Sequence, residues 1–192
     1  MGNKSDILEA FFETDFPLNK EGIEELLSLF NVRFYNKNSL ILKAGGKEKQ
    51  LRFLETGIVR EFYTTEDKET NINFYTKPQF ITDFSSLNNS TKTKKNQTSL
   101  TDIVLKTIDR GVFLKLLDKY ECGKEIVNLT FQRMLEKKEQ FEYSRITKTP
   151  EELYKELLEN QPDWLQNIPQ YHIASYLGVT PETLSRIRSR IS

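Results

Sequence analysis

The sequence predicts an α+β protein with an N-terminal antiparallel β-roll, a long helix and a C-terminal helix-turn-helix. Three observations support this fold class. Between Val32 and about Leu117, short runs rich in Phe, Tyr, Ile and Val alternate with turn residues, as in a small sandwich or roll. A long helical pattern follows, and the last segment divides into two short helices at Gly178. Two short amphipathic helices, on either side of Pro17, precede the strands.

The composition fits a globular protein and excludes several kinds of site. The 192 residues include 28 Lys and Arg against 28 Asp and Glu, so a nucleic-acid partner must be met by a local basic patch. One cysteine, Cys122, and one histidine, His172, cannot supply the usual ligand sets for zinc, iron–sulfur or haem. We therefore expect no metal and no cofactor. The sequence shows no signal peptide and no long apolar run, which favours a cytoplasmic location and no membrane partner.

Consecutive antiparallel strands are expected in the first half of the chain. Leu51–Leu54 and Ile58–Tyr63 flank Gly57, and Asn71–Tyr75 follows a charged turn, so these runs are interpreted as successive strands joined by tight turns. The stretch from Asn88 to Ser99 has no apolar residue. We therefore expect it to form an exposed loop or a wholly polar edge.

A long helix is predicted from about Lys124 to Ile146. Its apolar residues alternate steps of four and three, as in a two-stranded coiled coil. The dimer interface is assigned to Val127, Phe131, Met134 and Phe141. The same stripe could instead pack on the roll of its own chain. We favour the dimer interface, because Ile126, Leu129 and Leu135 supply a second apolar edge that could pack on the roll.

A further helix begins after a boundary near Lys148. Residues 149–152, Thr-Pro-Glu-Glu, have the pattern of a capping box, in which the Thr149 side chain accepts from the backbone N–H of Glu152. Pro150 suits the first helical position. We therefore divide the chain into a roll with N-terminal helices, the long helix and a helix-turn-helix domain, at residues 1–120, 121–148 and 149–192.

The C-terminal segment has the layout of a helix-turn-helix. Ala174 is small enough for two helices to cross closely, and Gly178 can adopt the left-handed conformation that ends the first helix. Thr180 and Pro181 suit the N-cap and the first position of the second helix. From Leu184 onward, apolar residues recur at spacings of three and four and are expected to face inward.

The outer face of this second helix is polar and basic. Arginine can pair bidentately with guanine, glutamate can accept from cytosine, and hydroxyl groups can hold phosphates. DNA binding is assigned to Thr180, Glu182, Thr183, Ser185, Arg186, Arg188 and Arg190. The alternative is a solvated helical hairpin without a partner. Ala174, the turn at Gly178, the cap at Thr180 and the exposed arginines occur together. This combination favours DNA binding over the hairpin without a partner.

Several segments of the chain match one family pattern. They are residues 43–46 (Lys-Ala-Gly-Gly), 53–60, 65–69, 80–84, the long helix and, most specifically, 179–188. On these segments nearly the whole chain resembles the Crp/Fnr superfamily of bacterial transcription factors, the relatives of the cyclic-AMP receptor protein and the fumarate–nitrate regulator.

The resemblance implies a jelly roll like that of cyclic-nucleotide-binding proteins, a dimerisation helix and a domain that reads two-fold symmetric DNA. It places Glu182 and Arg186 at positions that read base edges. The implied partners are double-stranded DNA and a second copy of the chain, with RNA polymerase as a further candidate.

The resemblance also implies an effector pocket in the roll, where the sequence departs from the family pattern. Thr82-Asp83 stands where cyclic-nucleotide binders have Gly-Glu, and a polar tract, Thr91 to Asn96, stands where they have Arg-Ser. A lysine in that tract is a point charge and does not reproduce the bidentate fork of arginine. The candidate pocket residues are Thr82, Asp83 and Lys94. We expect no classical cyclic AMP binding, and the effector is unknown.

Two other functions are open from the sequence. The chain could be a small-molecule or cyclic-nucleotide receptor, or a signalling module, whose C-terminal helices do not bind DNA. A cupin-like enzyme would also use a β-roll, but such sites need two or three histidines and the predicted roll contains none. We therefore predict a transcription regulator without enzymatic activity.

Overall fold

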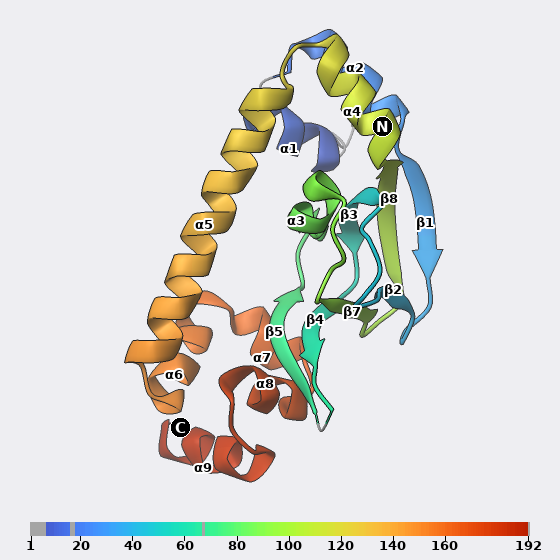
Figure 1. Cartoon of the computed structure of the whole chain (residues 1–192). Helices are drawn as coiled ribbons and strands as arrows, with labels where there is room; N and C mark the ends of the chain where they lie inside the picture. Colours follow the sequence, from blue (N-terminus) through green and yellow to red (C-terminus); the bar gives the residue numbers. More distant parts are fainter. Residues whose placement is uncertain (1–6, 16–17, 67, 192) are drawn as a thin grey trace, which may run out of the picture.

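One long helix joins a β-roll to a group of C-terminal helices (Figure 1). The structure is a computed structural model that describes residues 7–15, 18–66 and 68–191. Helix α5 (Gly123–Thr147) runs along one side of the molecule, from the N-terminal helices at one end to the C-terminal helices at the other (Figure 1). The remaining helices are α1 (Ile7–Asp15), α2 (Lys20–Ser28), α3 (Phe84–Asn89), α4 (Arg110–Lys119), α6 (Pro150–Asn160), α7 (Pro162–Asn167), α8 (Gln170–Leu177) and α9 (Pro181–Ile191).

The roll consists of two antiparallel sheets of four strands each, ordered β1-β8-β3-β6 and β2-β7-β4-β5. The strands are β1 (Asn31–Tyr35), β2 (Leu40–Leu42), β3 (Gln50–Thr56), β4 (Val59–Thr64), β5 (Glu69–Tyr75), β6 (Gln79–Phe80), β7 (Asn96–Ser99) and β8 (Ile103–Asp109). The predicted fold class is confirmed, with the α+β composition, the roll and the C-terminal helices in the expected order.

The apolar core of the roll lies on both faces of β3. Leu54 belongs to the core between the two sheets, which includes Val59 and Leu105. Its neighbour Phe53 points to the opposite face and meets the ring of Phe80 at 5.2 Å between centroids, as part of the core formed with α1, α2 and α4. Successive side chains of a strand point to opposite faces, so one strand contributes to both cores.

The tight turn at Gly57 joins two strands that are not neighbours. Strand β4 pairs with β5 as predicted, but β3 pairs with β6 and β8 in the other sheet. The expectation that β3 and β4 are adjacent strands was therefore wrong. Gly57 has a φ of +95°, and a Cβ at this position would lie 2.6 Å from Cγ2 of Ile103 and would clash with the Asp102 carbonyl. Glycine allows this close crossing between the sheets.

Polar residues 96–99 form an inner strand, not the exposed loop or polar edge that their composition predicted. Strand β7 lies between β2 and β4, and Gln97 and Ser99 are fully buried. Gln97 donates to the carboxylate of Glu61 at 2.8 Å and to the Ile81 carbonyl at 2.6 Å. Ser99 donates to the Asn36 carbonyl at 2.8 Å. Burial of polar side chains is tolerated when hydrogen bonds replace those to water, so composition alone misplaced this strand.

The helices after the roll begin and end close to the predicted positions. The capping box at α6 is present: the Thr149 N–H donates to Glu152 Oε2 at 2.7 Å and the Glu152 N–H donates to Thr149 Oγ1 at 3.3 Å. The division into three domains stays a prediction. Among the described residues no helix is both long enough and apolar enough to span a membrane.

Substitution Gly57→Ala is expected to lower the free energy of unfolding by about 2 kcal/mol or more, because it adds a clash to a positive φ. Gly45→Ala is the matched control, since Gly45 has a φ of +83° but no atom within 4 Å of the place that a Cβ would occupy. It should cost only about 1 kcal/mol. Urea unfolding of both variants measures the difference, and equal losses would contradict the close crossing.

Candidate nucleic-acid interface

Helices α8 and α9 lie where the helix-turn-helix was predicted, and a short turn at Gly178 joins them. Ala174 is fully buried where they cross. Gly178 has a φ of +73°, and the Val179 N–H donates to the Ala174 carbonyl at 3.0 Å, which completes the end of α8. The hydroxyl of Thr180 accepts from the Thr183 N–H at 3.3 Å and caps α9.

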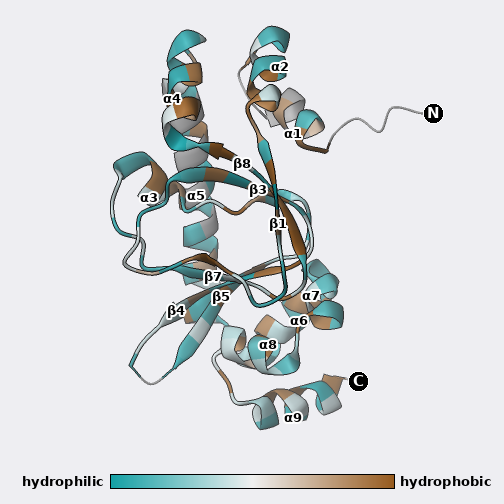
Figure 2. Ribbon diagram, turned by 90° about the vertical axis from the view of Figure 1, so that its right-hand side faces the viewer, coloured by the Kyte–Doolittle hydropathy of each residue, from teal (hydrophilic) through white to brown (hydrophobic). Residues whose placement is uncertain are grey.

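The predicted outer face of α9 is exposed. Leu184 and Ile187 are 1% and 2% exposed and face the core of the C-terminal helices. Thr183 is half-buried at the edge of the exposed face. The exposed residues are Thr180, Glu182, Ser185, Arg186, Arg188, Ser189 and Arg190. Helix α9 forms the lower edge of the molecule in Figure 2, on the side away from the roll.

Charged side chains at positions four apart form a stripe along this face. Glu182 lies on the first turn, where hydrogen bonds from its own backbone N–H and from Thr180 lower the pKa of its carboxyl, with a further contribution from the charge of Arg186. Glu182 is therefore ionised at neutral pH. Arg190, at the far end, forms an ion pair with Glu151 of α6 at 3.2 Å. Glu182 and Arg186 thus form an exposed pair of opposite charges on α9.

Helix α8 docks on strand β5 of the roll. The Asn71 N–H donates to Ser175 Oγ at 3.1 Å, and this hydroxyl donates to the Glu69 carbonyl at 3.1 Å. Nδ2 of Asn71 donates to the His172 carbonyl and lies the same distance, 3.2 Å, from its Nδ1. The rings of Phe74 and Trp164 meet edge to face at 5.0 Å beside these bonds. This docking was not predicted, because its partners are about one hundred residues apart in sequence.

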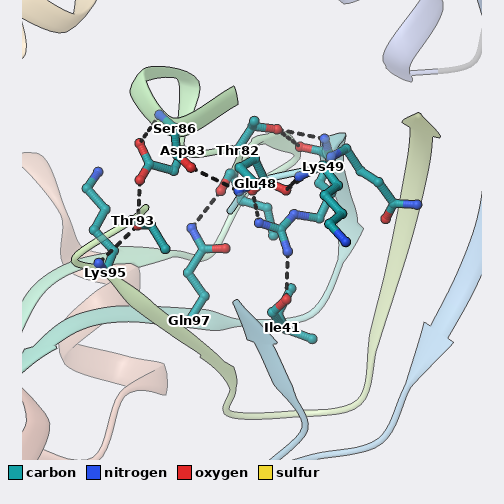
Figure 3. A network of polar contacts seen from close by, with 12 residues as sticks. Ile41, Glu48, Lys49, Thr82, Asp83, Ser86, Thr93, Lys95 and Gln97 are labelled. Atoms are coloured by element: carbon teal, nitrogen blue, oxygen red, sulfur yellow. Dashed lines mark hydrogen bonds and ion pairs between the residues drawn. The ribbon is translucent and has the colours of Figure 1, made fainter. Parts of the chain in front are cut away.

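The candidate effector residues lie at the start of α3, within a polar network inside the roll (Figure 3). Thr82 accepts from the Arg52 N–H at 2.7 Å, and Asp83 accepts from the Thr93 hydroxyl at 2.6 Å and caps α3. Lys94 is exposed, and the neighbouring Lys95 is the lysine whose side chain pairs with Glu61. In Figure 3 Lys95 joins the network through its main-chain N–H, which donates to the Thr93 hydroxyl. These residues precede β7, and Thr93 is buried while Lys94 beside it is exposed.

Three carboxylates are buried in this part of the roll, those of Glu48, Glu61 and Asp83. Glu61 accepts from the Tyr75 hydroxyl at 3.1 Å and from Gln97, and it pairs with Lys95 at 3.1 Å. Burial opposes the charge of Lys95, but the carboxylates of Glu61 and Asp83 raise its pKa above the ordinary value. The ammonium group of Lys95 thus neutralises part of the negative charge inside the roll.

Comparison with known proteins agrees with this architecture. Residues 32–120 match the cyclic nucleotide-binding domain. The catabolite activator protein of Thermus thermophilus is 20% identical, with a TM-score of 0.56 over 91% of this chain and 84% of that one. CLP, a c-di-GMP responsive global regulator of Xanthomonas campestris, is 14% identical, with a TM-score of 0.66 over 90% and 91%. A CooA mutant from Carboxydothermus hydrogenoformans is 16% identical, with a TM-score of 0.65 over 97% and 84%. No curated protein sequence matches.

Residues 32–120, a little under half of the chain, therefore resemble the cyclic nucleotide-binding domain. The chain as a whole has the fold of solved Crp/Fnr-family regulators.

The pKa of His172 is expected to be low, about 4 against an ordinary 6.5. Burial is the main cause, the charge of Arg60 adds to it and Glu69 opposes it. Neutral His172 thus stabilises the docked structure fully above pH 6.5, and this contribution is lost as the pH falls toward 4.

Proton NMR tests this expectation directly, because the chain contains one histidine. Its ring resonances should titrate near pH 4 in the native protein. A His172→Gln variant should lose less stability than the wild type between neutral and acidic pH. Titration at the ordinary histidine pKa would show that the ring is not enclosed between α8 and β5.

Proposed function

We propose that the protein is a homodimeric, sequence-specific DNA-binding transcription regulator without enzymatic activity. The single observation that carries the proposal is the face of α9, on which Glu182 and Arg186 are exposed on a rigid, capped helix. A helix with such a face fits the major groove of DNA, where arginine reads guanine and glutamate accepts from cytosine. The Crp/Fnr fold supports the same function.

The remaining assigned residues have supporting roles. Thr180 and Ser185 present hydroxyl groups beside the base-reading pair, and Arg188 and Arg190 continue the basic character toward the C-terminal end of α9. Hydroxyl and guanidinium groups of this kind hold phosphates and fix the register of the helix on the duplex. Because Arg190 also pairs with Glu151, its contact with a phosphate would compete with that ion pair.

Dimerisation through α5 is part of the proposal. The assigned residues Val127, Phe131 and Met134 lie on this helix, but their side chains are outside what the structure describes. Phe141 is half-buried, and its ring lies 6.4 Å from that of Tyr176 in the same chain. The exposed apolar side chains of α5 include Leu135, Tyr143 and Ile146, the last 83% exposed. An uncovered apolar helix face favours association with a second copy, which would place two recognition helices on two half-sites about 34 Å apart.

The interior of the roll argues against classical recognition of cyclic AMP. The positions of the family pocket are occupied by the bonded set of Thr82, Asp83 and Thr93, and by the pair of Glu61 with Lys95. A cyclic phosphate would meet the carboxylates of Glu61 and Asp83, and the guanidinium of the buried Arg52 is already paired with Glu48. We infer that the protein either responds to a different effector or has no effector. RNA polymerase is a candidate partner at the promoter.

A second candidate function is that of a small-molecule receptor without DNA binding. The observation that favours it is the match of residues 32–120 to the cyclic nucleotide-binding domain, which describes the roll alone. Selection of bound fragments from a random DNA pool separates the two functions. Enrichment of a two-fold symmetric sequence supports the regulator, and no enrichment even at low salt supports the receptor.

Substitution Arg186→Ala is expected to weaken binding to the selected DNA by about 1–3 kcal/mol and to relax preference at one base position in each half-site. Fluorescence anisotropy with the selected duplex and its single-base variants measures both effects. Lys115→Ala is the control, because it removes an exposed cation from α4 at the opposite end of the molecule (Figure 1). A uniform loss on all sequences would instead make Arg186 a phosphate contact.

Cyclic AMP is expected to give no saturable heat in titration calorimetry with the wild-type protein, because Glu61 and Asp83 repel the phosphate. The same sample should still bind the selected DNA, with an affinity that added cyclic AMP leaves unchanged. Saturable binding, or a change in DNA affinity, would show that the internal network opens to admit the nucleotide.

A further inference from the structure

Arg145, near the C-terminal end of α5, reaches from the long helix to the helix-turn-helix. One guanidinium nitrogen, Nη2, donates to the main-chain carbonyl of Tyr176 in α8. The guanidinium carbon lies 5.1 Å from the centroid of the Tyr176 ring and 5.2 Å from that of Phe141. A half-buried side chain of α5 therefore holds both the main chain and the ring of one residue in α8.

The accepted carbonyl belongs to the last turn of α8, where carbonyl groups lack partners within the helix. Two of them are satisfied locally, because the Val179 N–H donates to Ala174 and the Gly178 N–H donates to Ser175. Arg145 satisfies the carbonyl of Tyr176. A cation at this position also interacts favourably with the negative end of the helix dipole. The contact thus completes the C-terminus of α8 and contributes to its stability.

The same turn sets the direction of the DNA-reading helix. Gly178 follows Tyr176 by two residues, and a Cβ on Gly178 would lie 3.5 Å from Nη1 of Arg145, so the guanidinium lies directly against the turn. Thr180, two residues later, caps α9. A shift of Arg145 relative to α8 would therefore displace the turn from which α9 starts.

The Tyr176 ring also contacts the roll and α7. Its centroid lies 6.1 Å from that of Phe74 on β5 and 5.2 Å from that of Trp164 on α7. Tyr176 is therefore fixed between the roll and the long helix. Among the contacts described for the ring and the carbonyl of Tyr176, those with α5 are made by Arg145 and Phe141.

We propose that Arg145 is the positioning residue that couples the long helix to the DNA-reading helix. This inference rests on the proposed function: if α5 sets the geometry of the dimer, Arg145 transmits that geometry to α9 and so fixes the separation of the two recognition helices. The protein then discriminates between operators by the spacing of their half-sites. An effector that moves α5 acts on DNA binding through this contact.

Lysine cannot replace arginine in this role. The planar guanidinium stacks on aromatic rings while its nitrogens donate in fixed directions, and an ammonium group keeps the charge but loses both properties. Arg145→Lys therefore separates the geometry of the contact from its charge, and Arg145→Ala removes both.

The test uses full-length protein and DNA that the wild type selects from a random pool, together with versions whose spacer between half-sites is one base pair longer or shorter. We expect the wild type to bind the selected spacer more tightly than the altered ones. In both Arg145 variants, the ratio of these affinities should fall about tenfold. Their base preference within each half-site, read by Arg186, should be retained. Lys138→Ala is the control on the same helix, since Lys138 is exposed and pairs with Glu142 at 3.5 Å within α5.

A second readout does not depend on DNA. Hydrogen exchange of the main-chain amides of residues 177–180 should be faster in both Arg145 variants and unchanged in Lys138→Ala, with all proteins dimeric by sedimentation. Wild-type spacing preference in the Arg145 variants, or unchanged exchange in this turn, would overturn the proposal. Failure of the wild type to select any DNA would instead overturn the proposed function, and the exchange measurement would still decide whether Arg145 holds the turn.

Discussion

The position of the exposed helix α9 depends on the docking of α8 between the roll and the long helix. Strand β5 is at the edge of its sheet, and an edge strand leaves a row of main-chain groups unpaired. The Ser175 hydroxyl hydrogen-bonds two of these groups: it donates to the Glu69 carbonyl and accepts from the Asn71 N–H. A neighbouring strand would bond the same groups. The aromatic contacts of Phe74 and Tyr176 beside them are worth about 0.5–1.5 kcal/mol each beyond burial. The same docking of α8 therefore covers the edge of the sheet and fixes the position of α9.

The roll combines a cyclic nucleotide-binding fold with an interior that is already bonded. Besides the network of Glu61 and Lys95, Arg52 forms a buried ion pair with Glu48 and donates to the Ile41 carbonyl at 2.7 Å. Buried pairs of this kind contribute little net stability, because desolvation offsets their attraction, but removal of one partner is costly. The network therefore holds one arrangement of the strands and helix α3.

The two ends of α8 connect different parts of the molecule. Its first turn contacts β5 through His172, whose ring is neutral because burial and the charge of Arg60 disfavour its protonation. Its last turn contacts α5 through Arg145. Movement of either the roll or the long helix would therefore reach α9 through one short helix, which gives the proposed regulator a physical link between its N-terminal half and its DNA-binding face.

The sequence by itself determined the features that depend on neighbouring residues. The capping box at Thr149, the turn at Gly178 and the exposed face of α9 follow from spacing, caps and backbone freedom within a few residues. Only the tertiary structure decided the sheet to which β4 belongs, the burial of polar strand β7 and the choice of Lys95 over Lys94 in the network. It also decided the docking of α8, which joins Asn71 to Ser175. These outcomes depend on hydrogen bonds and packing between residues far apart in the chain, and local patterns carry no information about such partners.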